Sequence, residues 1–200
     1  MKRAMDILLS AVGLAVLAVP LGVIAWLVRL SSPGPAIFAQ RRAGFGGRPF
    51  TMYKFRSMRT NADPYGCSPR GGDDPRMTKV GRFLRETSLD ELPQLWNVLR
   101  GDMSLVGPRP LYERQAAEWT PRQRGRLDVR PGLTGYAQAM GRGELPIEDK
   151  IEMDLYYVQN QSLRLDVKIL LQTVLNAASG QQEVYEKQYS RTRLTERGPQ

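Results

Sequence analysis

The feature that most limits how this chain can fold is an uncharged, mostly apolar run near its N-terminus, residues 7–28. About 22 residues is within the usual length of a helix that crosses a bilayer. A cleaved signal peptide would have a shorter apolar core followed by a small-residue cleavage site. The segment that follows here, Arg29-Leu30-Ser31-Ser32-Pro33, makes a poor cleavage site. The run therefore predicts that residues 1–32 form a membrane anchor.

A proline interrupts the anchor near its middle. Pro20 removes one helical hydrogen bond and clashes with the carbonyl of Val16, and Gly22 weakens the helix further. Residues 7–19 would measure roughly 20 Å as a helix, enough to enter one leaflet but not to cross two. We therefore expect a helix that is broken near Pro20.

Positive charges flank both ends of the anchor. Two precede it and three follow it: Lys2, Arg3, Arg29, Arg41 and Arg42. Under the positive-inside rule both ends are expected on the cytoplasmic side. A re-entrant helix that bends at the proline and returns to its own side satisfies this pattern. A proline-kinked spanning helix is common in membrane proteins, and the residues alone leave both topologies open.

The rest of the chain predicts one α+β domain, mainly helical with a small β-hairpin, attached to the N-terminal re-entrant membrane helix. Strands are expected at 36–40 and 48–55 around a glycine-rich turn, and a loop at 60–76. Apolar periodicity predicts helices over 79–84, 89–99, 111–124, 147–159 and 165–177. Residues 105–110 and 130–135 read as tight turns. The expected organisation is an anchor at 1–32, a cytoplasmic catalytic domain at 33–180 and a polar, flexible tail at 181–200.

The composition restricts the chemistry that the domain can perform. The chain contains no histidine and a single cysteine, Cys67. A Ser-His-Asp triad, a histidine-ligated metal, a zinc cluster and an internal disulfide are therefore excluded. The net charge is +9 and the sequence pI about 10.0, which suits a phosphate-rich partner such as a nucleotide, a nucleic acid or an anionic membrane. Carboxylates, lysines, arginines and hydroxyls must supply the reactive groups.

Two adjacent carboxylates, Asp90 and Glu91, lie in the segment Ser88-Leu89-Asp90-Glu91. The segment also matches a helix capping box, with serine as N-cap and glutamate at N3, so a structural role alone could explain it. The helix expected at 89–99 would carry its apolar residues on one face, namely Leu89, Leu92, Leu95, Trp96 and Leu99.

Basic residues in rigid settings accompany the carboxylates. Lys54 and Arg56 share one face of a predicted strand because strand side chains alternate. Arg85 precedes the acids, Arg109 lies between two prolines that fix its backbone, and Arg142 lies between two glycines. Guanidinium groups bind phosphate with two parallel hydrogen bonds. These five residues are therefore the candidates for binding a phosphorylated substrate.

The chain resembles the monotopic phosphoglycosyl transferases, the bacterial sugar transferase family that starts membrane glycoconjugate synthesis. The matching segments run in order from residue 2 to about residue 177, and they include Tyr53-Lys54-Phe55-Arg56-Ser57-Met58, Ser88-Leu89-Asp90-Glu91-Leu92-Pro93-Gln94, Val106-Gly107-Pro108-Arg109-Pro110 and Asp154-Leu155-Tyr156-Tyr157. The family commonly breaks its membrane helix at Ser-Pro, where this chain has Val19-Pro20.

The resemblance implies an enzyme on the cytoplasmic face of the bacterial inner membrane. Asp90 would attack the phosphate next to the sugar of a UDP-sugar, UMP would leave, and a polyprenyl phosphate would take the phosphosugar. Glu91, with Asp90, would hold Mg²⁺, and the lack of histidine and cysteine also favours Mg²⁺ over zinc. Membrane lipids are the other expected partners, and nucleic acid is not one.

A second class of function is considered beside the transferase: a membrane-tethered, non-catalytic basic protein that binds nucleic acid or anionic lipid. Charge and anchor alone would allow it, but it assigns no role to the adjacent acids or to the rigid Pro108-Arg109-Pro110 segment. The sugar, the glycoconjugate pathway and the oligomeric state cannot be read from the sequence.

Overall fold

The computed structural model describes residues 1–63, 69, 73–141 and 145–179. The α-helices of this part are α1 (Lys2–Val16), α2 (Ala18–Ser31), α3 (Lys79–Glu86), α4 (Gln94–Arg100), α5 (Glu113–Ala117), α6 (Pro121–Arg124), α7 (Tyr136–Met140), α8 (Ile147–Gln159) and α9 (Leu163–Ala178). Short 3₁₀ turns are η1 (Phe45–Gly47), η2 (Leu89–Glu91) and η3 (Gly125–Asp128). The strands are β1 (Ile37–Ala43), β2 (Pro49–Phe55), β3 (Ser104–Val106) and β4 (Gly132–Thr134). The fold is mainly helical with two small sheets, as the predicted α+β class requires.

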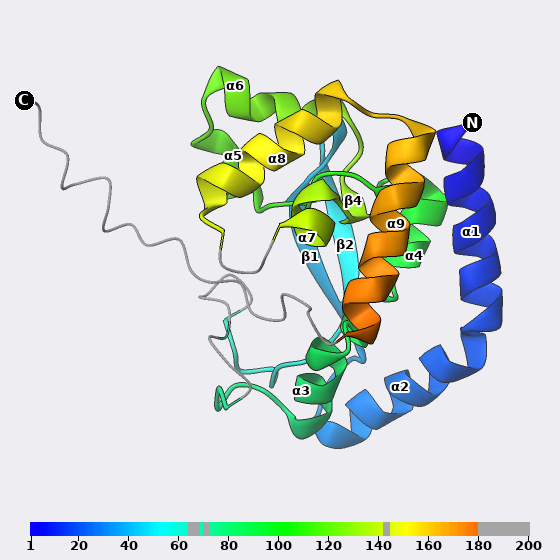
Figure 1. The fold of residues 1–200 in the computed structure, drawn as a ribbon. Helices are drawn as coiled ribbons and strands as arrows, with labels where there is room; N and C mark the ends of the chain where they lie inside the picture. The colour runs from blue at the N-terminus through cyan, green and yellow to red at the C-terminus, as the bar shows by residue number, and fades with distance from the viewer. Residues whose placement is uncertain (64–68, 70–72, 142–144, 180–200) are drawn as a thin grey trace, which may run out of the picture.

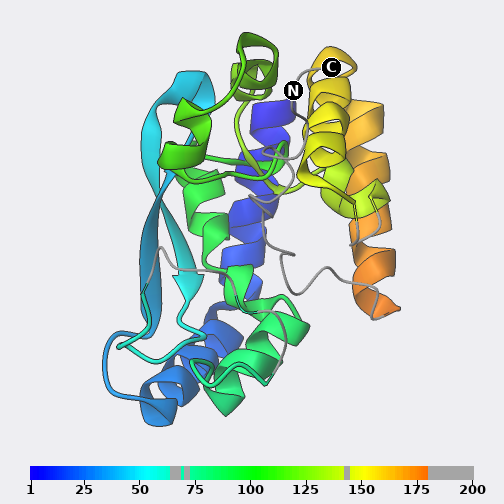
Figure 2. The ribbon, with the colours of Figure 1, turned by 90° about the vertical axis from the view of Figure 1, so that its left-hand side faces the viewer.

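The predicted hairpin is confirmed. Strands β1 and β2 pair antiparallel around the glycine-rich turn, and the register places Phe38 opposite Lys54. The hairpin lies on one side of the molecule in Figure 2 and α8 and α9 lie on the other, with α4 between them. Helix α1 runs along the outer edge of the molecule and packs against α4 (Figure 1). The main core fills the space between these layers and includes Met52, Val98, Met103 and Tyr157.

Proline accounts for two helices whose predicted extent is wrong. The helix expected at 89–99 is divided into the η2 turn and α4, because Pro93 lacks an N–H and takes the position before the first residue of α4. The helix expected at 111–124 is likewise two helices. Thr120 caps α6 with its side chain and Pro121 is the first helical residue, so a new helix begins there.

A parallel strand pair replaces the turn expected at 130–135. Ser104 pairs with Gly132 and Val106 with Thr134. The turn assigned to 105–110 begins with β3, the first of these strands. Strands of three residues that lie 28 positions apart leave no local periodicity, so the sequence pattern did not predict them. Helix α7 is similarly short and was not predicted.

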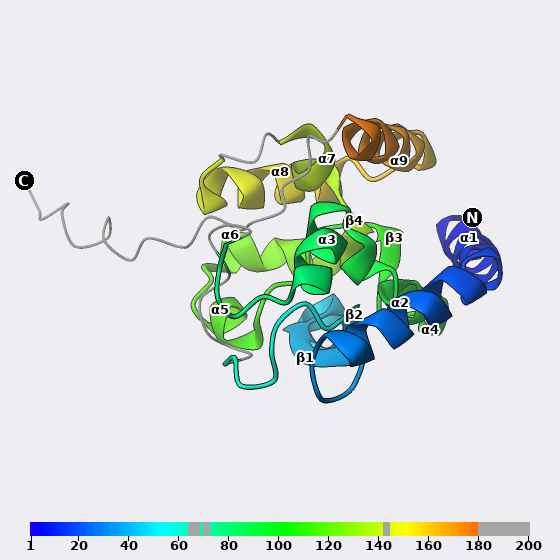
Figure 3. The same ribbon diagram turned by 90° about the horizontal axis from the view of Figure 1, so that it is seen from below.

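The break in the predicted anchor lies three residues before its proline. Helix α1 ends at Val16 and α2 begins at Ala18. Pro20 has no N–H that could donate to the Val16 carbonyl, so the helical hydrogen bond at this position is missing. No single helix among the described residues is long and apolar enough to cross a bilayer, but α1 and α2 together are, and they are bent by 64°. The pair runs along one side and the lower face of the domain (Figures 1 and 3).

The bent pair is apolar on both of its faces. Leu14 and Leu17 pack against the main core, and Leu21 and Ile24 pack against a second cluster around Val28. The opposite face exposes large apolar side chains along both helices: Leu8, Val12, Val16, Val19, Val23, Trp26 and Leu30. A contiguous exposed apolar surface of this kind is typical of a protein or membrane contact.

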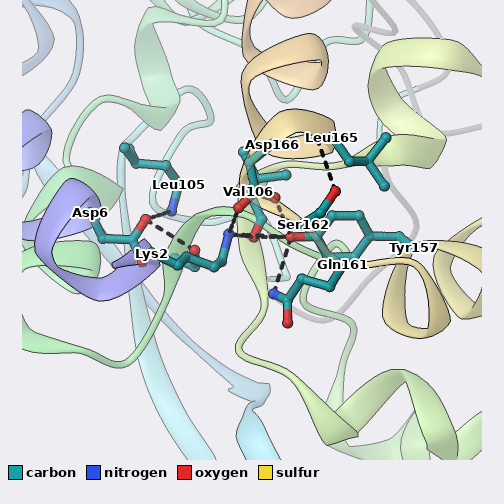
Figure 4. Close-up of polar contacts among 10 residues, drawn as sticks. Lys2, Asp6, Leu105, Val106, Tyr157, Gln161, Ser162, Leu165 and Asp166 are labelled. Atoms are coloured by element: carbon teal, nitrogen blue, oxygen red, sulfur yellow. Dashed lines mark hydrogen bonds and ion pairs between the residues drawn. The ribbon is translucent and has the colours of Figure 1, made fainter.

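Polar side chains fasten the first turns of α1 to the domain (Figure 4). Lys2 Nζ donates to Asp166 Oδ2 at 2.7 Å, to the carbonyl of Val106 at 2.9 Å and to the hydroxyl of Tyr157 at 3.2 Å. The buried Asp6 carboxylate accepts from the Leu105 backbone N–H at 3.0 Å. Because these partners come from β3, α8 and α9, the start of the chain is held by several elements of the domain.

The other end of the bent pair is fastened to the same domain by Arg56. This arginine is 6% exposed, and its guanidinium donates to the carbonyls of Ser32 at 2.7 Å, Pro33 at 2.9 Å and Val28 at 3.3 Å. It satisfies backbone acceptors at the end of α2 that the helix leaves without intrahelical partners. Both ends of the bent pair are therefore bound to one domain.

Candidate active site

A left-handed residue places the two carboxylates inside the domain. Helix α3 ends at Glu86, and Ser88 follows with φ 55°, the only positive φ outside glycine among the described residues. This conformation is unfavourable for a residue with a Cβ, and such strain is found most often at functional sites. The chain then enters the η2 turn, which contains Asp90 and Glu91. The capping-box interpretation is wrong, because the Ser88 side chain does not cap this turn.

Glu91 joins the two rigid basic residues. Its Oε1 atom accepts from Lys54 Nζ at 2.6 Å and from Arg109 Nη2 at 3.0 Å. Burial by itself would raise the pKa of Glu91. The charges of Arg109 and Lys54 outweigh burial and hold the pKa of this carboxyl well below its ordinary value. Glu91 is therefore an anion at any physiological pH.

Asp90 has a different environment. Its residue is 6% exposed, and no hydrogen bond from the described residues reaches its carboxylate. Burial raises the pKa of Asp90 above its ordinary value. The charge of Lys54 opposes this shift and that of Glu91 adds to it; Arg85 and Arg109 oppose it more weakly. Asp90 is therefore a buried carboxyl group that lies near three basic side chains and the anionic Glu91 and accepts no hydrogen bond from the described residues.

Asn97 fixes the strand that carries Lys54 against the helix that follows the acids. Its side chain is fully buried, donates to the Thr51 carbonyl at 2.7 Å and accepts from the Tyr53 N–H at 3.1 Å. These two bonds satisfy the β2 edge that β1 does not cover. The sequence offered a signal, since Asn97 is a polar residue within a helix with apolar neighbours, but no role had been assigned to it. Trp96, predicted to share one apolar helix face with Leu95, is 50% exposed, whereas Leu95 is buried.

Four of the predicted site residues other than Asp90 gather around it: Lys54, Arg85, Arg109 and Glu91. Two other predicted substrate-binding residues, Arg56 and Arg142, are not among the residues that the structure places around Asp90. Arg56 immediately follows β2, and its guanidinium is directed at the end of α2, where it is buried among backbone carbonyls. Arg142 lies outside the described residues.

The carboxyl pair can hold a divalent metal ion only with help from a ligand. No group of three or more His, Cys, Asp or Glu side chains suited to a metal occurs in the described part of the chain. Mg²⁺ is commonly bound by one or two carboxylates together with substrate phosphates and water. The contacts that Lys54 and Arg109 make with Glu91 both use Oε1, so among the described residues Oε2 is left to bind another cation. The donors of Asp90 and Glu91 thus fit Mg²⁺ in the presence of a phosphorylated ligand.

Two adjacent carboxylates, one of them bound by Lys54 and Arg109, are suited to phosphate-group chemistry. A model of the family described as bacterial sugar transferase matches residues 1–180. The chain belongs to the bacterial sugar transferase family.

Individual relatives agree with this assignment. The uncharacterized sugar transferase EpsL of Bacillus subtilis is 50% identical over 149 residues, which are 74% of this chain and 72% of that protein. A UDP-glucose:undecaprenyl-phosphate glucose-1-phosphate transferase of Caulobacter vibrioides is 46% identical and covers 86% of this chain and 68% of its own length. The UDP-N-acetylgalactosamine-undecaprenyl-phosphate N-acetylgalactosaminephosphotransferase of Aeromonas hydrophila is 42% identical over 90% of this chain, which spans only 44% of that protein.

Proposed function

We propose that this chain is a sugar-1-phosphate transferase that moves a phosphosugar from a UDP-sugar to a membrane polyprenyl phosphate and releases UMP. The observation that carries the proposal is the buried Asp90 next to Glu91, whose charge is held by Lys54 and Arg109. Relatives with named activities use UDP-sugars and undecaprenyl phosphate. Such a reaction would begin the synthesis of a glycoconjugate such as an exopolysaccharide.

In the first step, an oxygen of Asp90 attacks the phosphorus that carries the sugar. A bond forms between that oxygen and phosphorus, the bond to the bridging oxygen of the diphosphate breaks, and UMP leaves with the electron pair. An anionic nucleophile meets an anionic phosphate here, so neighbouring positive charge must lower the barrier. Lys54, Arg85 and Arg109 supply that charge.

In the second step, a phosphate oxygen of the polyprenyl phosphate attacks the same phosphorus, and the bond to Asp90 breaks. The covalent intermediate lets the water-soluble donor and the membrane-bound acceptor use the site in turn. Asp90 and Glu91 would hold Mg²⁺, which neutralises phosphate charge when bound.

The enzyme is proposed to be monotopic, with its catalytic domain on the cytoplasmic face of the bacterial inner membrane. Both ends of the bent pair α1–α2 contact one domain, through Lys2 at one end and Arg56 at the other. A spanning helix would put its ends on opposite sides of the membrane. The exposed apolar face of the pair would lie in the lipid, close to a polyprenyl phosphate headgroup.

We expect transfer of a phosphosugar from a UDP-sugar that appears in the name of a relative. Purified protein with Mg²⁺ and undecaprenyl phosphate in detergent should release UMP from UDP-glucose or UDP-N-acetylgalactosamine, and radiolabel from the sugar should enter the lipid. The measurements are UMP by coupled assay and labelled lipid by extraction. Release of UDP in place of UMP would reject the phosphosugar transfer. Steeply salt-dependent binding of DNA or RNA, with no turnover, would favour the non-catalytic basic protein.

Labelling of single cysteines should place both ends of the anchor on the cytoplasmic side. The background is Cys67→Ser, and the probes are Ala4→Cys and Pro35→Cys, both at exposed positions. A membrane-impermeant thiol reagent should modify both in inverted vesicles and neither in intact cells. Val16→Cys, 71% exposed and next to the bend, should resist the reagent in both preparations. Labelling of positions 4 and 35 from opposite sides would establish a kinked spanning helix.

A further inference from the structure

The segment Pro108-Arg109-Pro110 is held by a hydrogen bond at every carbonyl. The carbonyl of Pro108 accepts from the Gly132 N–H at 2.9 Å. The carbonyl of Arg109 accepts from Arg126 Nη2 at 2.9 Å, and that of Pro110 from Arg42 Nη1 at 3.2 Å. Two of the three donors are therefore side chains of buried arginines.

Arg126 comes from the η3 turn and is 3% exposed. The same Nη2 atom that bonds the Arg109 carbonyl also donates to Asp154 Oδ2 on α8. The guanidinium lies over the ring of Trp119, with Cζ 4.9 Å from the ring centroid. Asp154 is 2% exposed, so the charges of this pair are removed from water together.

A buried ion pair adds little stability, because desolvation of both charges offsets their attraction. Arg126 Nη1 and Asp154 Oδ1 are buried and find no hydrogen-bond partner among the described residues, which makes this pair still less favourable as a source of stability. What Arg126 contributes besides charge is the bond to the Arg109 backbone. Proline fixes φ of residues 108 and 110, and a residue that precedes a proline is itself restricted, so the backbone freedom that remains lies in the two peptide planes that flank Arg109.

The peptide plane that contains the Arg109 carbonyl is one of the two planes that set the direction of the Arg109 Cα–Cβ bond, and it is the one that Arg126 holds. Arg109 reaches Glu91 from a different part of the chain, and its Nη2–Oε1 distance is 3.0 Å. An error of about 1 Å in a positioned group can reduce a rate about 100-fold. Fixing the Arg109 carbonyl therefore helps to keep the Arg109 guanidinium within hydrogen-bond distance of Glu91.

We propose that Arg126, held by Asp154, is a positioning residue: its hydrogen bond to the Arg109 carbonyl fixes the backbone from which the Arg109 guanidinium meets Glu91 and the substrate phosphate. The inference rests on the proposed function, since it needs Arg109 to act on phosphate. Arg126 itself touches neither Glu91 nor any reacting atom.

The test replaces the pair by apolar residues of similar size, Arg126→Met with Asp154→Leu. Such a replacement of a buried pair is often neutral or stabilising, so the variant should fold and melt at or above the temperature of the wild type. Transfer should nevertheless fall about 10- to 100-fold, as for residues that orient a functional group. It is measured as UMP release from UDP-glucose or UDP-N-acetylgalactosamine, whichever the wild type uses faster.

A double-mutant cycle with Arg109→Ala separates positioning from general damage. If Arg126 acts through Arg109, adding the apolar pair to Arg109→Ala should change the remaining rate less than 2-fold. A further loss as large as in the wild-type background would overturn the inference and leave the proposed function intact. A wild-type rate for Arg109→Ala would contradict the phosphate role of Arg109 and the inference with it.

Hydrogen exchange gives a readout that does not need activity. In the full-length apolar-pair variant, the peptide covering residues 105–112 should exchange about tenfold faster, while the peptide of α4 should be unchanged. The matched control is Arg122→Gln with Glu152→Gln, an exposed ion pair between α6 and α8, which should change neither exchange nor transfer. Unchanged exchange at 105–112 in the apolar-pair variant would overturn the inference.

Discussion

Replacing Asp90 by asparagine is expected to abolish phosphosugar transfer, by at least about 10⁴-fold, while the protein remains folded. An amide cannot form the proposed acyl phosphate, and loss of a nucleophile generally removes most of an enzyme's rate enhancement. The fold should tolerate the change. Burial disfavours the charged form of Asp90, and its carboxylate accepts no hydrogen bond from the described residues.

The measurements are UMP release, transfer of label to lipid, and the melting temperature. Asp90→Asn should melt at the temperature of the wild type or slightly above it, because a buried charge has been removed. Asp149→Asn, at an exposed position in the first turn of α8, makes the same chemical change and should leave transfer unaltered. Transfer by Asp90→Asn at more than a few per cent of the wild-type rate would exclude Asp90 as the nucleophile.

Replacing Glu91 by glutamine is expected to weaken Mg²⁺ binding and to slow transfer about 10²- to 10³-fold. Glutamine keeps the shape and an acceptor oxygen, but it removes the negative charge that Lys54 Nζ and Arg109 Nη2 now contact at 2.6 and 3.0 Å. The two cations then lose this anionic partner, and a bound metal ion would meet a neutral amide oxygen in place of an anionic carboxylate.

A titration of the transfer rate with Mg²⁺ checks this expectation. The concentration for half-maximal rate should rise at least about tenfold in Glu91→Gln. Glu86→Gln, exposed at the end of α3, provides the control and should follow the wild-type titration curve. A Glu91→Gln enzyme with normal Mg²⁺ dependence would show that Glu91 is not a metal ligand, even if its turnover were low.

Local patterns predicted the parts of the fold that depend on local interactions. The hairpin follows from glycines between two apolar strands, and α8 and α9 follow from apolar periodicity over many residues. Two prolines divide helices that apolar periodicity predicted as continuous: Pro93 immediately precedes α4, and Pro121 is the first residue of α6. The pairing of β3 with β4 joins distant segments of three residues each, so no local pattern indicates it.

In the candidate site, too, the features that depend on local sequence were predicted and those that depend on tertiary packing were not. Adjacent acids and a proline-flanked arginine were visible in the sequence, and the structure brings Lys54 and Arg109 onto Glu91. Strand alternation placed Arg56 with Lys54, but β2 ends at Phe55, and burial against the end of α2 takes its guanidinium elsewhere. The contact of Arg126 with Arg109 depends on tertiary packing and could not be predicted. The domain boundaries and the flexible tail at 181–200, outside the described residues, stay predictions.

Mass spectrometry of the donor-treated enzyme tests the central claim most directly. The full-length protein is incubated with the UDP-sugar that it uses and with Mg²⁺, without any polyprenyl phosphate, then quenched, digested and mapped. One phosphosugar should be attached to the peptide containing Asp90, with one UMP released per enzyme molecule, and adding the acceptor lipid should remove the modification. A phosphosugar attached to another residue, or lipid product formed without any phosphosugar attached to the enzyme, would show that Asp90 is not the nucleophile.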